Sequence, residues 1–319
     1  MAVLDVKHLT VGYGKVQAVR DVNLSLEKGE ILGIVGESGS GKSTLGSAIT
    51  KLLRPPGKIL SGEIRFEGED LVPLTEKQLR HKRWTDISVV MQSGMNALNP
   101  VATIRRQFED VILVHQPMGK AKMAERVDEM LQLVNIDPVY ADHYPHELSG
   151  GMKQRVSIAL ALVLDPKLIL FDEPTTALDV VVQRFIVQNL KMLRRRYNFS
   201  ALFISHDLGT VLEIADRVAV MYAGQIVEMQ TTRNLLRHPK HPYTEALLRC
   251  FPDPRAEIIE AVGIPGTPPD LADITPGCPF APRCTRSIST CFSETPAYVM
   301  EKDTGLACHL AGREAEVQA

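Results

Sequence analysis

One glycine-rich segment constrains this chain more than any other: Gly36-Glu-Ser-Gly-Ser-Gly-Lys42-Ser43, which fits the pattern GxxxxGK followed by Ser or Thr. It follows an apolar run at residues 30–36, and from Lys42 onward apolar residues recur at helical spacing. Glycines between a strand and a helix let backbone amides converge on phosphate oxygens, and the helix N-terminus adds a favourable dipole. The pattern predicts a nucleotide phosphate-binding loop. The alternative, a glycine-rich turn that binds nothing, is disfavoured by the Lys-Ser pair at the required place.

This loop predicts ATP and Mg²⁺ as ligands and gives its side chains separate tasks. Lys42 would bring positive charge to the β- and γ-phosphates, and Ser43 would offer its hydroxyl to Mg²⁺. The residues expected to contact the nucleotide are Gly36, Ser38, Gly39, Ser40, Gly41, Lys42, Ser43 and Thr44.

Carboxylates for the metal and the attacking water are expected at the end of a second apolar run, LILFDE. Residues 168–171 predict a buried strand that ends in Asp172 and Glu173. Asp172 would hold Mg²⁺ through water, and Glu173 would polarise the water that attacks phosphorus. An acidic pair at the surface end of a strand is the alternative, which the phosphate loop makes a minor one.

Composition excludes several classes of protein. Hydrophobic residues make up 45% and charged residues 23% of the 319 residues, which excludes wholesale disorder. Thirty-six basic and 38 acidic residues give a formal charge of −2, without the basic excess of most nucleic-acid-binding proteins. The sequence has no apolar run of eighteen residues and no N-terminal signal pattern, so we expect any membrane role to come through a partner.

Strand patterns alternate with helical ones along most of the chain, which predicts an α/β core with a parallel sheet. Period-two alternation in the first thirty residues predicts an antiparallel flank. Residues from about 96 to 164 predict a helical insert, with one amphipathic helix at 122–134, and a further helix is expected at 181–197. The proline-rich stretch at 264–284 predicts an irregular segment that needs a staple to stay ordered.

The segment Leu148-Ser-Gly-Gly-Met152 stands between the phosphate loop and LILFDE. This order resembles that of the ABC-transporter ATPases, and the resemblance covers about residues 1–240. It implies a P-loop NTPase (RecA-like) core and an ATP-hydrolysing domain over residues 1–238, with a helical subdomain at about 93–165. The remaining residues, 239–319, would form a small irregular, cysteine-rich extension.

The resemblance also assigns roles to residues outside the phosphate loop. Tyr13 would stack on adenine, although a tyrosine at a strand end is often an ordinary surface residue. Gln92, which follows the strand-like SVVMQ, would contact Mg²⁺ and report on the transport subunit. Asp179 ends a segment, Thr176-Ala-Leu-Asp179, that is similar to the D-loop. His206, in ALFISHD, would contact the γ-phosphate and help Glu173 to place the water.

Ser149, Gly150 and Gly151 open an apolar helix, and a glycine-rich helix start is suited to phosphate. The chain's own loop already fills that role, so a second anion-binding helix end makes sense if it serves another subunit's nucleotide. The resemblance implies such an arrangement, with two ATPase domains clamping two ATP molecules head to tail. The alternative is a helix cap whose glycines allow close packing.

Residues 93–107 follow Gln92 and, by resemblance, face a membrane subunit. The stretch MNALNP is similar to that of oligopeptide and dipeptide importers. Met91, Met95 and Leu98 would offer soft apolar contacts, and Arg105 and Arg106 would meet acidic groups; ordinary core and solvated positions are the alternative. The implied partners are two transmembrane permeases, a second ATPase (identical or homologous) and, indirectly, an extracytoplasmic substrate-binding protein. Nucleic acid is not expected as a partner, and the chain is expected at the cytoplasmic face of the membrane.

Four of the five cysteines lie beyond residue 277. Five, six and sixteen residues separate Cys278, Cys284, Cys291 and Cys308 in turn, without the short paired spacing that structural zinc usually shows. This favours an iron–sulfur cluster, with zinc and free thiols as alternatives. Residues 264–284 resemble the C-terminal extension of peptide-importer ATPases, which implies a structural [4Fe–4S] cluster. Cys250, outside this set, is expected to be a small buried apolar residue.

Two other functions remain to be weighed against a peptide importer. A soluble ABC ATPase of DNA repair or translation would carry a long coiled-coil insert or a second cassette, which the sequence lacks. A P-loop kinase would not carry LSGGM together with His206. The transported substrate is not readable, because the ATPase subunit does not touch it, and related machinery serves nickel, glutathione or oligosaccharides.

Overall fold

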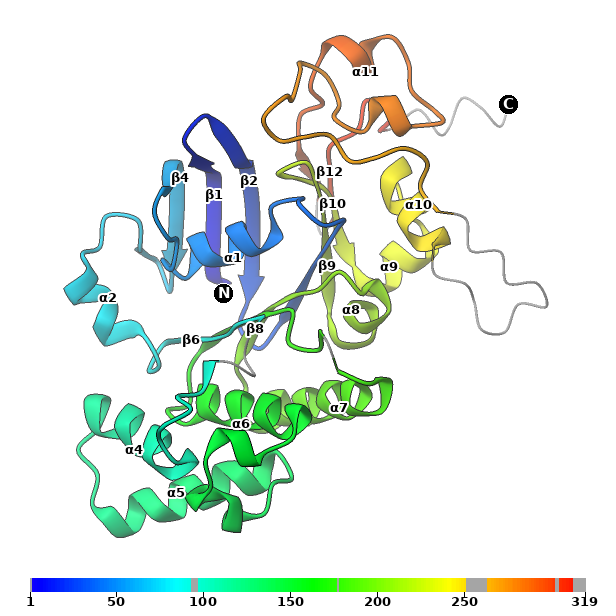
Figure 1. Cartoon of the computed structure of the whole chain (residues 1–319). Helices are drawn as coiled ribbons and strands as arrows, with labels where there is room; N and C mark the ends of the chain where they lie inside the picture. The colour runs from blue at the N-terminus through cyan, green and yellow to red at the C-terminus, as the bar shows by residue number, and fades with distance from the viewer. Residues whose placement is uncertain (1, 93–96, 177, 251–262, 302–303, 312–319) are drawn as a thin grey trace. The chain divides into compact units, whose positions relative to one another are not determined.

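The computed structural model describes residues 2–92, 97–176, 178–250, 263–301 and 304–311 (Figure 1). The chain forms two compact units, and each is assembled from separate stretches of sequence. The first unit comprises residues 1–4, 26–30 and 66–204, and the second comprises residues 5–25, 31–65 and 205–319.

Long strands form the predicted antiparallel flank, most of which belongs to the second unit. Strands β1 (Ala2–Tyr13) and β2 (Val16–Glu27) are neighbours in the sheet and are joined by two residues. A connection this short can join only antiparallel strands. Strand β4 (Gly57–Phe66) lies on the other side of β1. The antiparallel flank is therefore confirmed.

A second sheet in this unit carries the strand that precedes the phosphate loop. Its strand order is β11-β12-β10-β9-β3. Strand β3 (Ile31–Val35), every residue of which is buried, runs parallel to β9 (Arg217–Tyr222), with Val35 opposite Val220. Strand β10 (Gln225–Thr231) returns antiparallel to β9. This unit also contains the helices α1 (Lys42–Ile49), α8 (Leu208–Ile214), α9 (Thr232–Arg237) and α10 (Pro242–Arg249).

The end of the C-terminal extension is less irregular than its sequence predicts. Residues 264–284 lack regular structure apart from the short turn η3 (Ala281–Arg283), as expected, and a short helix α11 (Thr290–Ser293) follows. Strand β12 (Thr304–Leu306), however, pairs with β10, and β11 (Val299–Glu301) pairs with β12. Backbone hydrogen bonds between these strands therefore supply part of the restraint that keeps the proline-rich tail ordered. Strands of three residues are too short to show an alternating pattern in the sequence.

The first unit holds the other parallel strands of the α/β fold. Strands β6 (Ile87–Val90), β7 (Leu168–Asp172) and β8 (Ser200–Ile204) are parallel, with β7 in the middle. Every residue of β7 and β8 is buried, which explains their continuous apolar sequence. The unit also contains the short strand β5 (Glu69–Asp70) and the helix α2 (Glu76–Lys82).

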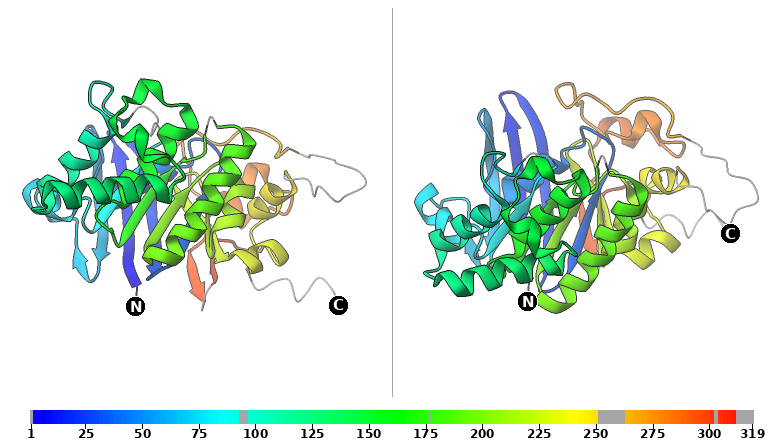
Figure 2. Two further views of the ribbon diagram at one scale, coloured as in Figure 1. Left: turned by 90° about the horizontal axis from the view of Figure 1, so that it is seen from below. Right: turned by 60° about the horizontal axis from the view of Figure 1, so that its bottom comes forward.

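The predicted helical insert is also confirmed. Helix α5 (Lys120–Leu133) packs against both α4 (Ile104–His115) and α6 (Gly150–Leu162) (Figure 2). Met123, Val127, Met130 and Leu131 form the buried face of α5, as their spacing predicts. Helix α7 (Val180–Tyr197) follows, and the short turns η1 (Pro138–Asp142) and η2 (Pro145–Glu147) connect α5 to α6. Within the described residues, no helix has the length and apolarity needed to cross a bilayer.

Candidate functional site

Glycines shape the loop between β3 and α1. Gly36 has a φ of 152° and a Cβ there would lie 2.2 Å from the carbonyl oxygen of Met221. Gly41 has a φ of 97°, and a Cβ there would lie 2.3 Å from the carbonyl oxygen of Ala18. Only glycine fits both places. Gly41 is also the N-cap of α1 and has no side chain to bond the first-turn amides, which therefore suit an anion.

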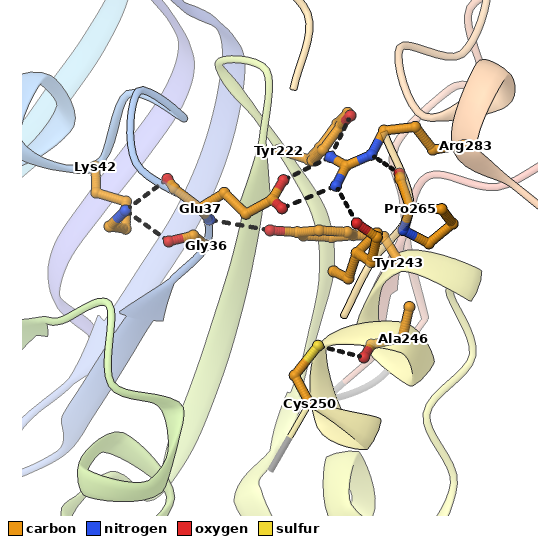
Figure 3. Close-up of polar contacts among 10 residues, drawn as sticks. Gly36, Glu37, Lys42, Tyr222, Tyr243, Ala246, Cys250, Pro265 and Arg283 are labelled. Carbon is orange, nitrogen blue, oxygen red and sulfur yellow. Dashed lines mark hydrogen bonds and ion pairs between the residues drawn. The ribbon is translucent and has the colours of Figure 1, made fainter. Parts of the chain in front are cut away.

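Lys42 lies over the inside of this loop. Its Nζ donates hydrogen bonds to the carbonyl oxygens of Gly36 at 2.7 Å and Glu37 at 2.9 Å (Figure 3). The side chain is buried, whereas Ser38, Gly39 and Ser43 are exposed. The ammonium group is thus fixed at the centre of a loop whose rim is open, as a phosphate-binding lysine requires.

Two other predicted residues of the second unit lie close to the sheet edges. The backbone amide of Ser205 donates to the carbonyl oxygen of Ile34 at 3.2 Å, which brings the exposed His206 to the end of β3, just before the loop. Tyr13, at the end of β1, is half-buried, and its ring lies against Gly57, where a Cβ would be 2.7 Å from a ring carbon. The Tyr13 ring therefore already contacts the chain itself.

In the first unit, β7 delivers the predicted carboxylates. Asp172 and Glu173 are only 4% and 7% exposed. Glu173 has a φ of 53°, in the left-handed region that is unfavourable for a non-glycine residue and doubly so before proline. Its amide donates to the carbonyl oxygen of Ile204 at 2.9 Å, and the Thr176 hydroxyl donates to its carboxylate at 2.8 Å. Backbone strain held by such contacts is typical of functional positions.

Gln92 lies at the same edge of the sheet as these carboxylates. Strand β6 is parallel to β7, with Val90 opposite Phe171, so the exposed Gln92 comes just after the end of β6, near the position of Glu173. Carboxylate and amide oxygens are ligands that Mg²⁺ accepts. The first unit therefore places Gln92, Asp172 and Glu173 at or just after the ends of neighbouring parallel strands, and their joint role at a metal ion stays a prediction.

The Ser149 turn caps helix α6, and one of its two glycines is needed for close packing. Ser149 is the N-cap of α6, and its Oγ accepts a hydrogen bond from the amide of Met152 at 3.3 Å. Ser149 and Gly150 are exposed. A Cβ at Gly151, by contrast, would lie 2.9 Å from the Cγ1 of Val182, so this glycine allows α6 to pack against α7. The packing alternative is correct for Gly151.

The contact at Gly151 places the start of α7 beside the Ser149 turn. Asp179 is the N-cap of α7, and its Oδ1 accepts from the amide of Val182 at 2.9 Å. Val180 and Val181 are 67% and 79% exposed. Exposed valines next to an open helix N-terminus are typical of a surface that another polypeptide covers. Ala177, in the predicted D-loop, lies outside the described residues.

The segment after Gln92 differs from its predicted surface. Met95 lies outside the described residues, and Leu98 is only 5% exposed, so it belongs to the core and does not offer a partner contact. Arg105 pairs with Asp142 at 2.7 Å, and Arg106 pairs with Asp110 on its own helix. The acidic groups that these arginines meet are therefore in the same chain. Among the described residues of this segment, Val101 is 81% exposed, and sequence reasoning missed it.

The four clustered cysteines lie within electrostatic reach of one another. Burial, with a smaller contribution from the neighbouring thiols of Cys291 and Cys308, raises the pKa of the Cys278 thiol to about 11. Burial also raises the pKa of Cys284 and Cys308. Cys291 is buried, and the other three are half-buried. Across the part of the chain that the structure describes, no group of three or more His, Cys, Asp or Glu side chains is arranged to hold a metal ion.

Cys250 lies outside this set. The sequence predicts that it is buried, but in the structure it is only partly buried. It is the C-cap of α10, half-buried, and its Sγ donates to the carbonyl oxygen of Ala246 (Figure 3).

Sequence reasoning also missed the groups that surround Glu37 in the phosphate loop. The Glu37 amide donates to the Tyr243 hydroxyl at 3.0 Å, and its carboxylate accepts two hydrogen bonds from Arg283. More than two hundred positions separate these residues in the sequence, and no local pattern connects them.

Comparison with known protein families agrees with this geometry. Residues 19–176 match the family model "ABC transporter", and residues 227–291 match "Oligopeptide/dipeptide transporter, C-terminal region". The second match includes residues 239–291 of the extension, with Cys250 and three of the four clustered cysteines.

Curated relatives match nearly the whole chain. The oligopeptide transport ATP-binding protein OppD of Bacillus subtilis is 46% identical, and the match covers 94% of this chain and 86% of OppD. The dipeptide transport ATP-binding protein DppD of the same organism is 43% identical, over 98% of this chain and 96% of DppD.

Solved structures show the same fold. A dimeric structure of MJ0796, described as a bacterial ABC transporter cassette, superposes with a TM-score of 0.66 at 30% identity, over 72% of this chain and 99% of that one. A second MJ0796 dimer, a post-hydrolysis state bound to ADP and Pi, gives a TM-score of 0.65 over the same shares.

Proposed function

Because this chain belongs to the ABC transporter family, as an ATP-binding subunit of the oligopeptide and dipeptide importer type, we propose that its phosphate loop binds ATP and that Asp172, Glu173 and His206 serve the hydrolysis of ATP. The chain is the ATPase subunit of a peptide importer. The observation that carries this function is the pairing of an intact phosphate loop with a C-terminal region of the oligopeptide/dipeptide type in one chain.

The chain's own groups supply most of what phosphoryl transfer needs. Loop amides and Lys42 hold the β- and γ-phosphates and stabilise the charge that develops on them. Glu173 takes the proton of a water whose oxygen attacks the γ-phosphorus, while the bond from that phosphorus to the β–γ bridging oxygen breaks. His206 donates toward the γ-phosphate and keeps the water in line. Tyr13 offers its ring to adenine.

Each unit by itself presents oxygen donors of the kind that Mg²⁺ binds. The Ser43 hydroxyl is exposed at the loop, and Asp172 and Gln92 end neighbouring parallel strands. Hard oxygen ligands of this kind suit Mg²⁺. When bound, the ion offsets part of the phosphate charge.

A second ATPase subunit completes each site. The exposed amides at Ser149 and Gly150 suit the γ-phosphate of a nucleotide held by the partner's loop. Val180 and Val181, exposed beside this turn, become buried in that contact. A single chain therefore binds ATP, whereas rapid hydrolysis requires the closed pair, whether the partner is identical or homologous.

Permease contact is assigned to the surface at the start of α4. The amide of Ile104 bonds to the carbonyl oxygen of His143, which places Val101 in the same region as Val139 and Tyr144. Their exposed fractions are 81%, 60% and 41%, an apolar group of the kind that marks a protein interface. Through it the subunit binds two permeases at the cytoplasmic face of the membrane, and the substrate-binding protein acts only through them.

Reconstitution tests this function. The chain, co-expressed with the two permeases of a peptide importer of this type, should co-purify with them. Its ATP hydrolysis in proteoliposomes should rise several-fold when a peptide-loaded binding protein is added on the opposite side. A variant that lacks the phosphate-binding lysine, Lys42→Ala, is the control that should show no rise. Hydrolysis that responds to nucleic acid, together with no co-purified permease, would contradict the assignment.

We further propose that Cys278, Cys284, Cys291 and Cys308 hold a [4Fe–4S] cluster. The support is electrostatic: other thiols of this set contribute to the raised pKa of Cys278, Cys284 and Cys308. Their wide spacing in the sequence suits four iron corners better than one zinc ion. The cluster would cross-link a tail that has little core of its own.

Loss of one thiol tests the cluster without reference to activity. Anaerobically purified wild-type chain should be brown, and Cys284→Ser should lose most of the visible absorbance because one iron corner has lost its ligand. Cys250→Ser, outside the set, should keep the full absorbance. Colourless wild-type protein that contains one zinc ion per chain would show the proposal to be wrong.

A further inference from the structure

The C-terminal extension reaches the phosphate loop through Arg283 (Figure 3). Arg283 ends the turn η3, directly before Cys284. Its two terminal nitrogens donate to the two carboxylate oxygens of Glu37, at 2.7 Å and 3.0 Å. Parallel hydrogen bonds of this bidentate form are the strongest that arginine makes with a carboxylate. A residue of the extension is thus joined to a residue inside the loop.

Arg283 is held in this orientation by its surroundings. Its Nε donates to the carbonyl oxygen of Pro265 at 2.8 Å, and the guanidinium lies 5.8 Å from the ring centre of Tyr222 and 6.0 Å from that of Phe280. Its side chain is 6% exposed. The bond to Glu37 raises the pKa of Arg283, so the group stays charged. The pair therefore differs from a mobile ion pair at the surface, which contributes little to the stability of the fold.

The extension and α10 contact the loop at two further places. The Tyr243 hydroxyl of α10 accepts a hydrogen bond from the Glu37 amide, and its ring packs against Tyr222 and Phe280. Residues 268–271 and loop residues 37–40 line a common cavity of about 340 Å³. The outer side of the loop is thus bordered by residues that follow the ATPase core in the sequence.

The charge of Glu37 gives this contact a consequence for nucleotide binding. A carboxylate inside a loop that binds a triphosphate opposes the bound anion and offsets the charge of Lys42. Paired with Arg283, Glu37 adds no net charge. Without Arg283, the same carboxylate would stand unpaired beside the phosphates.

We propose that Arg283 is a positioning residue for nucleotide binding: it neutralises Glu37 and holds the phosphate loop in the shape that receives the triphosphate. The proposal rests on the proposed function, in which this loop binds ATP. It gives the extension a role in ATP binding by its own chain.

Binding of ATP with Mg²⁺ to the full-length chain, measured by calorimetric titration, tests the proposal. Arg283→Gln keeps most of the side-chain stem but removes the charge, and it should raise the dissociation constant about tenfold, the equivalent of ~1.4 kcal/mol. Arg283→Lys should recover part of this loss. In the double variant Glu37→Gln with Arg283→Gln the loss should shrink to about threefold, because no unpaired carboxylate remains. A purely structural role for Arg283 would not be relieved in this way.

A matched control comes from the same segment. Arg286 forms an ion pair of 2.7 Å with Glu245, which is not a residue of the phosphate loop. Arg286→Gln should therefore bind ATP as the wild type does. Wild-type affinity in Arg283→Gln would overturn the proposal, and so would a double variant as weak as Arg283→Gln alone. If thermal unfolding shows that Arg283→Gln does not fold, ATP binding by Arg283→Lys is compared with that of the wild type at low and high salt. Wild-type affinity in Arg283→Lys would then overturn the proposal. Failure of the wild type itself to bind ATP would instead overturn the proposed function.

Discussion

Glu173→Gln should bind ATP as tightly as the wild type and slow its hydrolysis by about 10³-fold, within the range of a lost general base. Glutamine keeps the size of the side chain and accepts the hydrogen bond from Thr176, but it cannot take a proton from water. The ATP-bound state should therefore accumulate. Single-turnover hydrolysis of radiolabelled ATP, together with ATP binding by titration, measures the two effects separately.

The accumulated state should also be visible as an assembly. With ATP and Mg²⁺, the Glu173→Gln subunit should elute as a closed pair of ATPase subunits, whereas ADP should not retain the pair. Glu125→Gln removes an exposed carboxylate of α5 in the same unit, and it should turn over like the wild type. Undiminished turnover in Glu173→Gln would refute the role of Glu173 as the base.

Ser149→Asp should lower turnover by about 10²-fold or more in the assembled importer while ATP binding to the single chain stays unchanged. Aspartate is as good an N-cap as serine, so helix α6 should keep its start. The added negative charge would, however, meet the γ-phosphate of the nucleotide held by the partner, and lost stabilisation at such a position costs about 10²–10³ in rate.

Ser149→Asn is the matched control for this substitution, because asparagine caps a helix equally well and carries no charge. It should keep most of the activity. If Ser149→Asp hydrolyses ATP as fast as Ser149→Asn in the assembled importer, the turn does not contact a nucleotide phosphate.

Strong local patterns made the central parts of the fold predictable. Strands β3 and β7 are continuous apolar runs because they are buried, and the glycines at 36 and 41 are needed for the loop geometry. The face of α5 followed from its helical period. In these segments, local propensity and the burial of the final fold agree.

Features that depend on distant contacts were not predictable. Leu98 and Val101 are both apolar, and only the packing around α4 decides that the first is buried and the second exposed. The left-handed backbone of Glu173 is held by Ile204 on a neighbouring strand. The pairing of Arg283 with Glu37 depends on a tail whose proline-rich sequence carries no periodicity.

The central claim is that ATP is clamped between the phosphate loop of one polypeptide and the Ser149 turn of its mate. A structure of the Glu173→Gln subunit with ATP and Mg²⁺ in its assembled pair tests this claim most directly. The account predicts the Ser149 hydroxyl and the Gly150 amide within hydrogen-bond distance of the γ-phosphate held by the opposite loop. A Ser149 turn that faces away from every bound nucleotide would contradict it.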